Sequence, residues 1–160
     1  MQDSDKLLLE QQELINSLSN YEIELGVISG KSKNREKSFK AVTNADLMFI
    51  HENGSPLRNI PKRPVLEMSL IEAKDKMIEE TIDIIIDKII NDDWTQSDIE
   101  LELNKLCIRI QTFARQIIYS NDGRLAPNSP TVAAKKKGNH PLFDTGQLAR
   151  SIVCVLNKKN

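Results

Sequence analysis

The sequence has few aromatic residues, few cysteines and no long apolar run. Aromatic residues make up 4% of the 160 residues, which argues against a surface built to stack bases or sugars. The two cysteines, Cys107 and Cys154, are too few for a disulfide-stapled scaffold and lack the spacing of a metal or redox pair. The most apolar run, residues 82–90, is interrupted by three charged residues. We therefore expect no membrane span.

The amino terminus also lacks a basic segment followed by an apolar stretch, so we expect no secretory signal and a soluble protein made in a reducing compartment. The formal net charge is only −1, which excludes a global field that would attract DNA or acidic lipid. Apolar residues make up 39% and charged residues 28%, as in ordinary globular proteins. This length predicts a single domain over residues 1–160.

Apolar spacing predicts most of the helices and strands. Helices are expected over residues 3–18, 44–53, 66–90 and 99–117, and strands over 21–27 and 152–156. Asn44 is the expected cap of the second helix and Gly54 its end. In the third helix the apolar face is expected at Leu70, Met77, Ile78, Ile82, Ile85 and Ile89, and in the fourth at Ile99, Leu103, Leu106, Ile110, Phe113 and Ile117.

These elements predict an α+β fold in which a long antiparallel helix pair packs on a small antiparallel sheet. A connection of only a few residues, 91–94, favours the antiparallel arrangement of the two long helices. Residues 31–40 and 121–140 have no apolar period and contain lysine, glycine or proline, so we predict two long loops there.

Charge is distributed unevenly along the chain. Residues 65–105 contain twelve acidic and four basic residues, a balance of −8, whereas residues 122–160 contain two acidic and seven basic residues, a balance of +5. This asymmetry permits head-to-tail contact between copies of the chain, and it equally suits faces that are simply solvated.

One short motif suggests catalysis. Asp144-Thr-Gly is the triplet of aspartic proteases, in which two such carboxylates share a proton. A homodimer using Asp144 is therefore one alternative, although only fourteen residues follow Gly146 and the chain is largely helical. The other interpretation is structural: Asp144 and Gln147 have the spacing of a capping box at the start of a short helix.

Other candidate sites are weak. His51-Glu52 begins like a zinc-protease helix, but position 55 is serine instead of the second histidine, so we expect no metal and no cofactor. Two basic clusters, residues 31–37 and Lys135, Lys136 and Lys137, could contact phosphate. Without interleaved aromatic residues they predict at most weak, non-specific DNA contact, and a small nucleic-acid-binding packaging accessory is the second alternative.

Three passages together resemble a known family. They are Ala45-Asp-Leu-Met-Phe-Ile-His-Glu-Asn-Gly54, Asn59-Ile-Pro-Lys-Arg-Pro-Val-Leu66, and the segment from Leu125 through His140-Pro-Leu-Phe-Asp-Thr-Gly-Gln-Leu-Ala-Arg-Ser-Ile152. In this order they are similar to the "IHE.G", "IP.RPFL" and "PL.DTG.L..SI" elements of the tail-completion or neck proteins of tailed bacteriophages, also called head-tail joining or virion-morphogenesis proteins. Val65 stands where that family often has an aromatic residue.

The resemblance implies a structural virion protein without enzymatic activity. Such a protein is made in the host cytoplasm, is located in the neck or tail region of the particle, and assembles as a homo-oligomeric ring. Its partners would be the portal or connector and the tail tube or tail terminator proteins, with no membrane involved.

Within this interpretation, the residues expected at subunit or partner interfaces are Pro61, Arg63, Pro64, Lys135, Lys136 and Lys137. The two prolines stiffen an extended segment and lower the entropy lost when it docks. Arg63 can place its guanidinium fork on a carboxylate, either of a neighbouring subunit or of a helix in the same chain.

Overall fold

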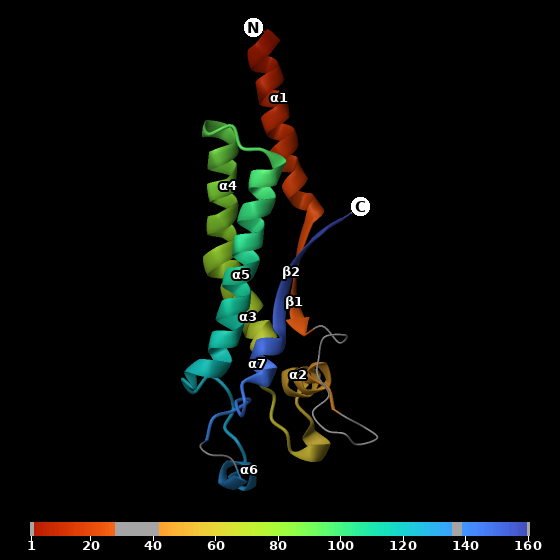
Figure 1. Cartoon of the computed structure of the whole chain (residues 1–160), viewed down its shortest axis with the longest axis vertical. Coiled ribbons are helices and arrows are strands. Elements are labelled where there is room, and N and C mark those ends of the chain that lie inside the picture. The colour runs from red at the N-terminus through yellow and green to blue at the C-terminus, as the bar shows by residue number, and fades with distance from the viewer. Residues whose placement is uncertain (1, 28–41, 136–138, 160) are drawn as a thin grey trace. The chain divides into compact units, whose positions relative to one another are not determined.

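The computed structural model describes residues 2–27, 42–135 and 139–159 (Figure 1). It is 67% helical with one two-stranded antiparallel sheet, so the predicted α+β class is confirmed. The packing of a helix pair on that sheet stays a prediction. The chain divides into two compact units: unit 1 comprises residues 1–24, 72–109 and 154–160, and unit 2 comprises residues 25–71 and 110–153.

The chain begins with a helix and a strand, as predicted. Helix α1 spans Gln2–Ser17, a short 3₁₀ turn spans Leu18–Asn20, and strand β1 spans Tyr21–Val27. Within unit 1, the side-chain amide of Gln11 on α1 donates to the carbonyl oxygens of Ile89 and Ile90 at 3.2 and 3.1 Å. These bonds satisfy carbonyl groups that a helix leaves without partners at its C-terminal end.

The helix predicted over 66–90 is interrupted by a π turn. Helix α3 spans Val65–Ala73, the π turn η4 spans Lys74–Ile78, and α4 spans Glu79–Asn91. Its buried residues recur every fourth position, at Val65, Ser69, Ala73, Thr81, Ile85 and Ile89. The prediction was wrong for Leu70, which is 39% exposed. In a regular helix of 3.6 residues per turn, residues spaced four apart move gradually to a different side of the helix. The extra residue of the π turn offsets part of this rotation, so the buried residues stay on one side.

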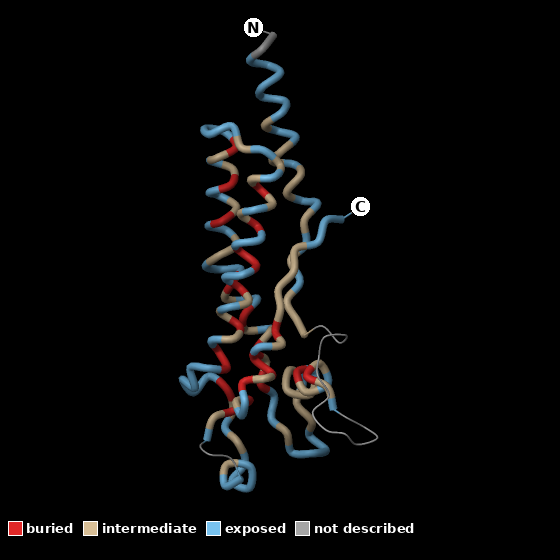
Figure 2. The backbone as a smooth tube through the Cα atoms, viewed as in Figure 1, coloured by how far each residue is buried: buried red, intermediate tan, exposed pale blue. Residues whose placement is uncertain are grey.

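Helix α5 spans Gln96–Ser120 and follows the sequence prediction closely. Ile99, Leu103, Leu106, Ile110 and Ile117 are buried as expected, and buried residues recur along α5 between exposed ones (Figure 2). Thr95 precedes the helix, and the carboxylate of Asp98 accepts the Thr95 backbone N–H at 2.9 Å. In unit 1, α4 and α5 run side by side (Figure 1), and Arg109 on α5 lies 3.3 Å from a carboxylate oxygen of Glu80.

Helix α2 spans Asn44–Asn53 in unit 2. Its cap is Thr43, which forms a capping box with Asp46, and not Asn44, which is buried in the first turn. Gly54 ends the helix as predicted, at a φ of 71°. A Cβ atom there would lie 3.0 Å from the backbone nitrogen of Lys62, so both backbone conformation and space require glycine.

A small core holds the remaining elements of unit 2. Helix α7 spans Gln147–Ser151 and leads into strand β2, Ile152–Lys158, which pairs with β1. Arg115 on α5 donates from Nη2 to the carbonyl oxygens of Ile152 and Arg150 at 2.7 and 3.2 Å. The core cluster consists of Met48, Val65, Ala114, Ile117, Ile118, Leu125, Leu142, Leu148, Ala149 and Ile152.

The two predicted loops have different outcomes. Helix α6, Pro130–Lys135, lies inside the segment 121–140, so that segment is not a loop throughout. The predicted loop over 31–40 lies outside the described residues. Among the helices in the described ranges, none has the length and apolar character that a bilayer span requires.

Candidate functional site

Arg63 lies at the centre of a hydrogen-bonded cluster in unit 2. Its backbone N–H donates to the carbonyl oxygen of His51 at 2.6 Å. Its Nε and Nη2 donate to the carbonyl oxygens of Ala126 and Pro127 at 2.6 and 2.7 Å. Its Nη1 lies 3.3 Å from Nδ1 of His51, which accepts because a guanidinium can only donate. Arg63 therefore joins three segments: the end of α2, the stretch before α3, and residues 126–127.

The sequence did not predict the partners of the Arg63 guanidinium. The side chain is 4% exposed and its fork binds two backbone carbonyl groups rather than a carboxylate of a helix in the same chain. Its contact with a carboxylate of a neighbouring subunit stays a prediction. Residues 126 and 127 belong to no helix or strand that would supply donors to their carbonyl groups, and Arg63 donates to both. Burial lowers the pKa of the guanidinium.

Glu52, in the last turn of α2, caps the start of α3. One carboxylate oxygen accepts the backbone N–H of Leu66 at 2.6 Å and the other accepts that of Glu67 at 3.4 Å. The first N–H groups of a helix have no partner inside it and favour a nearby negative charge. Burial raises the pKa of Glu52, and these two hydrogen bonds oppose that increase. Sequence analysis missed this role because helix-capping patterns are local, whereas Glu52 and Leu66 are 14 positions apart.

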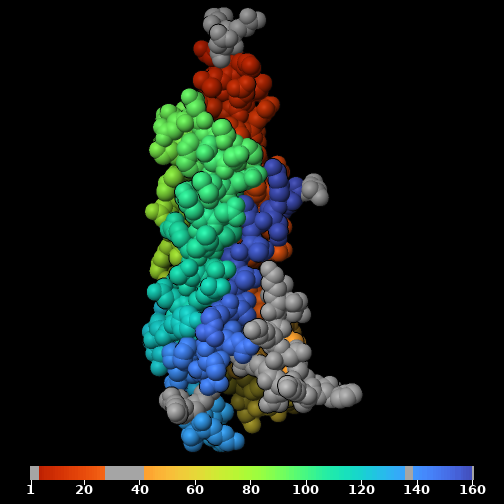
Figure 3. Space-filling model, viewed as in Figure 1, coloured from red at the N-terminus to blue at the C-terminus, as the bar shows by residue number. Residues whose placement is uncertain are grey.

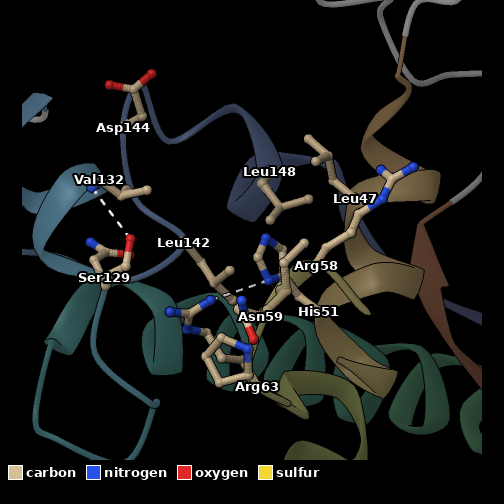
Figure 4. A pocket seen from close by; sticks show the side chains of 13 residues that line it. Leu47, His51, Arg58, Asn59, Arg63, Ser129, Val132, Leu142, Asp144 and Leu148 are labelled. Carbon is tan, nitrogen blue, oxygen red and sulfur yellow. Dashed lines mark hydrogen bonds between the residues drawn. The ribbon is translucent and has the colours of Figure 1, made fainter. Parts of the chain in front are cut away.

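A pocket opens beside Arg63, entirely within unit 2, with a volume of about 360 Å³. Its apolar wall includes Leu47, Ile60, Val132, Leu142 and Leu148, and its polar wall includes His51, Arg58, Asn59, Arg63, Asn128 and Ser129. In Figure 4 the labelled side chains of His51, Arg63, Leu142 and Leu148 gather around one space. Such a mixture of apolar surface and a few donors is typical of a recognition site.

Asp144 and Gln147 do not form the predicted cap. Helix α7 begins at Gln147, its cap is Gly146 at a φ of 72°, and no side chain bonds to the cap. The left-handed glycine sets the start of the helix, which places Asp144 too far from the first turn. Asp144 is exposed and lines the pocket, and Figure 4 shows its carboxylate aimed away from the other labelled side chains.

Of the other predicted interface residues, Pro61 and Pro64 lie beside this site. Pro61 is exposed on the pocket wall, and the carbonyl oxygen of Pro64 accepts the N–H of Met68 at the start of α3. Lys135 is exposed at the end of α6, whereas Lys136 and Lys137 lie outside the described residues. Their contact with a subunit or partner stays a prediction.

The histidine and cysteine side chains contact other groups of the chain. No three His, Cys, Asp or Glu side chains there are grouped as a metal site would require. Nε2 of His140 is 2.5 Å from the carbonyl oxygen of Ile118. Cys107 is buried, and a hydrogen bond with Cys154 raises the pKa of the Cys154 thiol. Nothing in the spacing of the two cysteines, 47 positions apart, indicated this pairing.

Comparisons with protein-family models, with curated proteins and with solved structures gave no match to the chain.

Proposed function

We propose that the chain is a structural protein of a tailed-phage particle, or of a phage-like particle. It assembles at the neck, helps to complete the tail and helps to join the tail to the head. The proposal includes a ring of identical copies that contacts the portal or connector and the tail tube or tail terminator proteins, and it includes no catalysis.

One observation carries the proposal: the three passages that resemble the tail-completion family meet at Arg63. His51 and Glu52 belong to the first passage, Arg63 to the second, and Ala126 to the third. This contact supports the proposal because it brings together passages that are far apart in sequence.

The roles of these residues also favour a structural protein. The side chains that could serve as a catalytic acid or base, those of His51 and Glu52, bond to other parts of unit 2. They order the segments around the pocket. A rigid scaffold that presents loops and exposed prolines suits assembly with other proteins, because less entropy is lost when a pre-ordered segment docks.

The proposal is tested by deleting the gene from a phage or prophage that encodes it. We expect filled heads and unjoined or incomplete tails to accumulate, as seen by electron microscopy, and wild-type protein supplied in trans should restore joined particles. Joined, infectious particles in the deletion strain would contradict the proposal. Cleavage of peptide substrates by the purified protein, lost on Asp144→Asn, would instead favour the protease alternative.

A further inference from the structure

The pocket beside Arg63 contains a buried positive charge without an acidic partner in unit 2. The guanidinium is 4% exposed and its three side-chain contacts are two carbonyl oxygens and a histidine ring. Among the described residues of unit 2, no Asp or Glu forms an ion pair with it. Buried charges in proteins are normally paired, because removal from water is costly. A carboxylate entering the pocket would supply the missing counter-charge.

The same pocket has an unused hydrogen-bond donor. Nδ2 of Asn128 is buried and bonds to no atom of the described residues. Asn128 lines the pocket and directly follows Pro127, whose carbonyl oxygen accepts from Arg63. A buried donor without an acceptor costs free energy. Both polar features of the pocket therefore call for the same ligand group, an oxygen acceptor with negative charge.

The chain itself has an abundant source of such groups. Unit 1 contains seventeen acidic and eight basic residues, a balance of −9, and unit 2 contains six acidic and fourteen basic residues, a balance of +8. Complementary charges steer association and select partners. Because each copy of the chain has both units, the acidic unit 1 of one copy can approach the basic unit 2 of another.

Within unit 1, helix α4 presents an acidic row. Glu79, Asp83 and Asp87 are exposed and follow one another at intervals of four residues, so they lie along one side of the helix. Among the described residues, neither Glu79 nor Asp83 forms an ion pair, whereas Glu80 pairs with Arg109. Like charges at this spacing destabilise a helix, and a cationic partner would relieve that repulsion. The side chains of α4 lie at the molecular surface in Figure 3.

We propose that the Arg63 pocket of one copy takes a carboxylate from the Glu79, Asp83, Asp87 row of a second copy, so that the copies join head to tail. Different surfaces meet in such a contact, so each copy keeps one free pocket and one free acidic row, and the contact can repeat into a ring or a filament. The inference rests on the proposed function for one point, that the partner is a second copy of the chain.

The first experiment measures self-association of the full chain by sedimentation velocity over a wide range of protein and salt concentrations. The pocket variant is Asn128→Asp, which removes the unused donor and supplies an internal carboxylate. Val132→Asp, at an exposed residue of the pocket wall, is the second pocket variant in case the first does not fold. The row variant combines Glu79→Gln, Asp83→Asn and Asp87→Asn.

We expect the wild-type chain to form species larger than a dimer, and salt to weaken them. Each variant should weaken association about tenfold or more, since removing one side of a buried charge pair speeds dissociation of the complex. Asn121→Asp makes the same chemical change at an exposed residue of unit 2 outside the pocket and should associate like the wild type. Thermal unfolding checks that each variant is folded.

The second experiment mixes the pocket variant with the row variant. Each lacks one half of the contact, so the intact pocket of the row variant can bind the intact row of the pocket variant. We expect a one-to-one complex that grows no further. A wild-type chain that stays monomeric at every concentration, variants that associate like the wild type, or a mixture that does not pair would each overturn the inference.

These outcomes are separate from those of the gene deletion. A protein that fails to self-associate through this contact can still be required to join heads to tails, and the deletion would show it. Salt-dependent binding of short duplex DNA to the wild type and to all variants alike, without self-association, would also overturn the inference and would favour the nucleic-acid alternative.

Discussion

Two arginines show how differently units 1 and 2 use charge. Arg109 in unit 1 lies 3.3 Å from Glu80, and both side chains are about half exposed, at 46% and 60%. Arg63 in unit 2 is buried and donates to three backbone carbonyl oxygens of other segments, those of Ala126, Pro127 and His51. Exposed pairs contribute little to stability, whereas buried polar groups must be satisfied. Arg63 therefore orders several segments of unit 2, whereas Arg109 forms one exposed ion pair in unit 1.

Replacing each arginine by methionine tests this comparison directly. Arg63→Met keeps an unbranched apolar side chain but leaves the carbonyl oxygens of Ala126 and Pro127 without donors, so we expect a loss of about 3 to 5 kcal/mol in the free energy of unfolding. Arg109→Met should cost less than about 1 kcal/mol, because its ion pair is exposed. Urea unfolding followed by circular dichroism measures both. Equal losses for the two variants would show that Arg63 has no special role.

An effect of intermediate size concerns the π turn. Deleting Asp87 rotates Ile89 away from the face of the helix that Ile85 occupies. We expect the free energy of unfolding to fall by about 2 to 5 kcal/mol, as it does when a buried isoleucine is lost in other proteins. Deleting Asp75 from the π turn η4 should cost less than about 1 kcal/mol. The shortened turn would become regular helix, and Ala73 and Thr81 would then be seven residues apart, close to two full turns. Thermal unfolding of both deletions measures the difference.

A result in which the two deletions destabilise the protein equally would show that the π turn does not act as a one-residue insertion. Asp75→Ala and Asp87→Ala are the matched controls, since they remove the same carboxylates without changing the register. Both residues are exposed, so these substitutions should change stability little.

The smallest expected effect is a difference in pH dependence between carboxylates. Hydrogen bonds from Thr95 hold the pKa of Asp98 below its ordinary value of 3.8, so its contribution to stability is present above pH 3.8 and is lost as the pH falls through the lowered pKa. Burial raises the pKa of Glu52 above 4.5, so its effect has the opposite sign and stability falls as the pH rises from 4.5 through the raised pKa.

Nuclear magnetic resonance titration of the carboxyl carbons measures these two pKa values separately. Glu52→Gln should remove the second component of the pH dependence while keeping an oxygen that can accept from Leu66. A pKa of Glu52 below 4.5 would show that the hydrogen bonds from Leu66 and Glu67 outweigh burial.

The regular elements could be predicted from the sequence, because their signals are local. The four-three spacing from Ile99 to Ile117 predicted α5, and the alternation at Tyr21 to Val27 predicted β1. The π turn could not be predicted, since the buried residues at intervals of four include Ser69 and Thr81, which a search for apolar residues passes over. The cap at Thr43 was missed because Asn44 is also a favoured capping residue.

The candidate site was less predictable because its contacts are not local. The proline-flanked position of Arg63 drew attention to it, but its partners at 126 and 127 lie more than sixty positions away. The spacing of Asp144 and Gln147 fitted a capping box, but the cap residue is the left-handed Gly146 and no side chain caps the helix. The sequence does not indicate that Nδ2 of Asn128 lacks a hydrogen-bond partner, because the fold determines which acceptors lie near a side-chain amide.

The link between the end of α2 and the start of α3 has a consequence for motion. Glu52 holds the first N–H groups of α3, and the carbonyl oxygen of His51 holds the N–H of Arg63. Neither helix end can fray without releasing the other, so the amide protons of Arg63 and Leu66 should exchange with deuterium at one shared rate. A partner protein that binds either α2 or α3 would then slow the local unfolding of both helix ends.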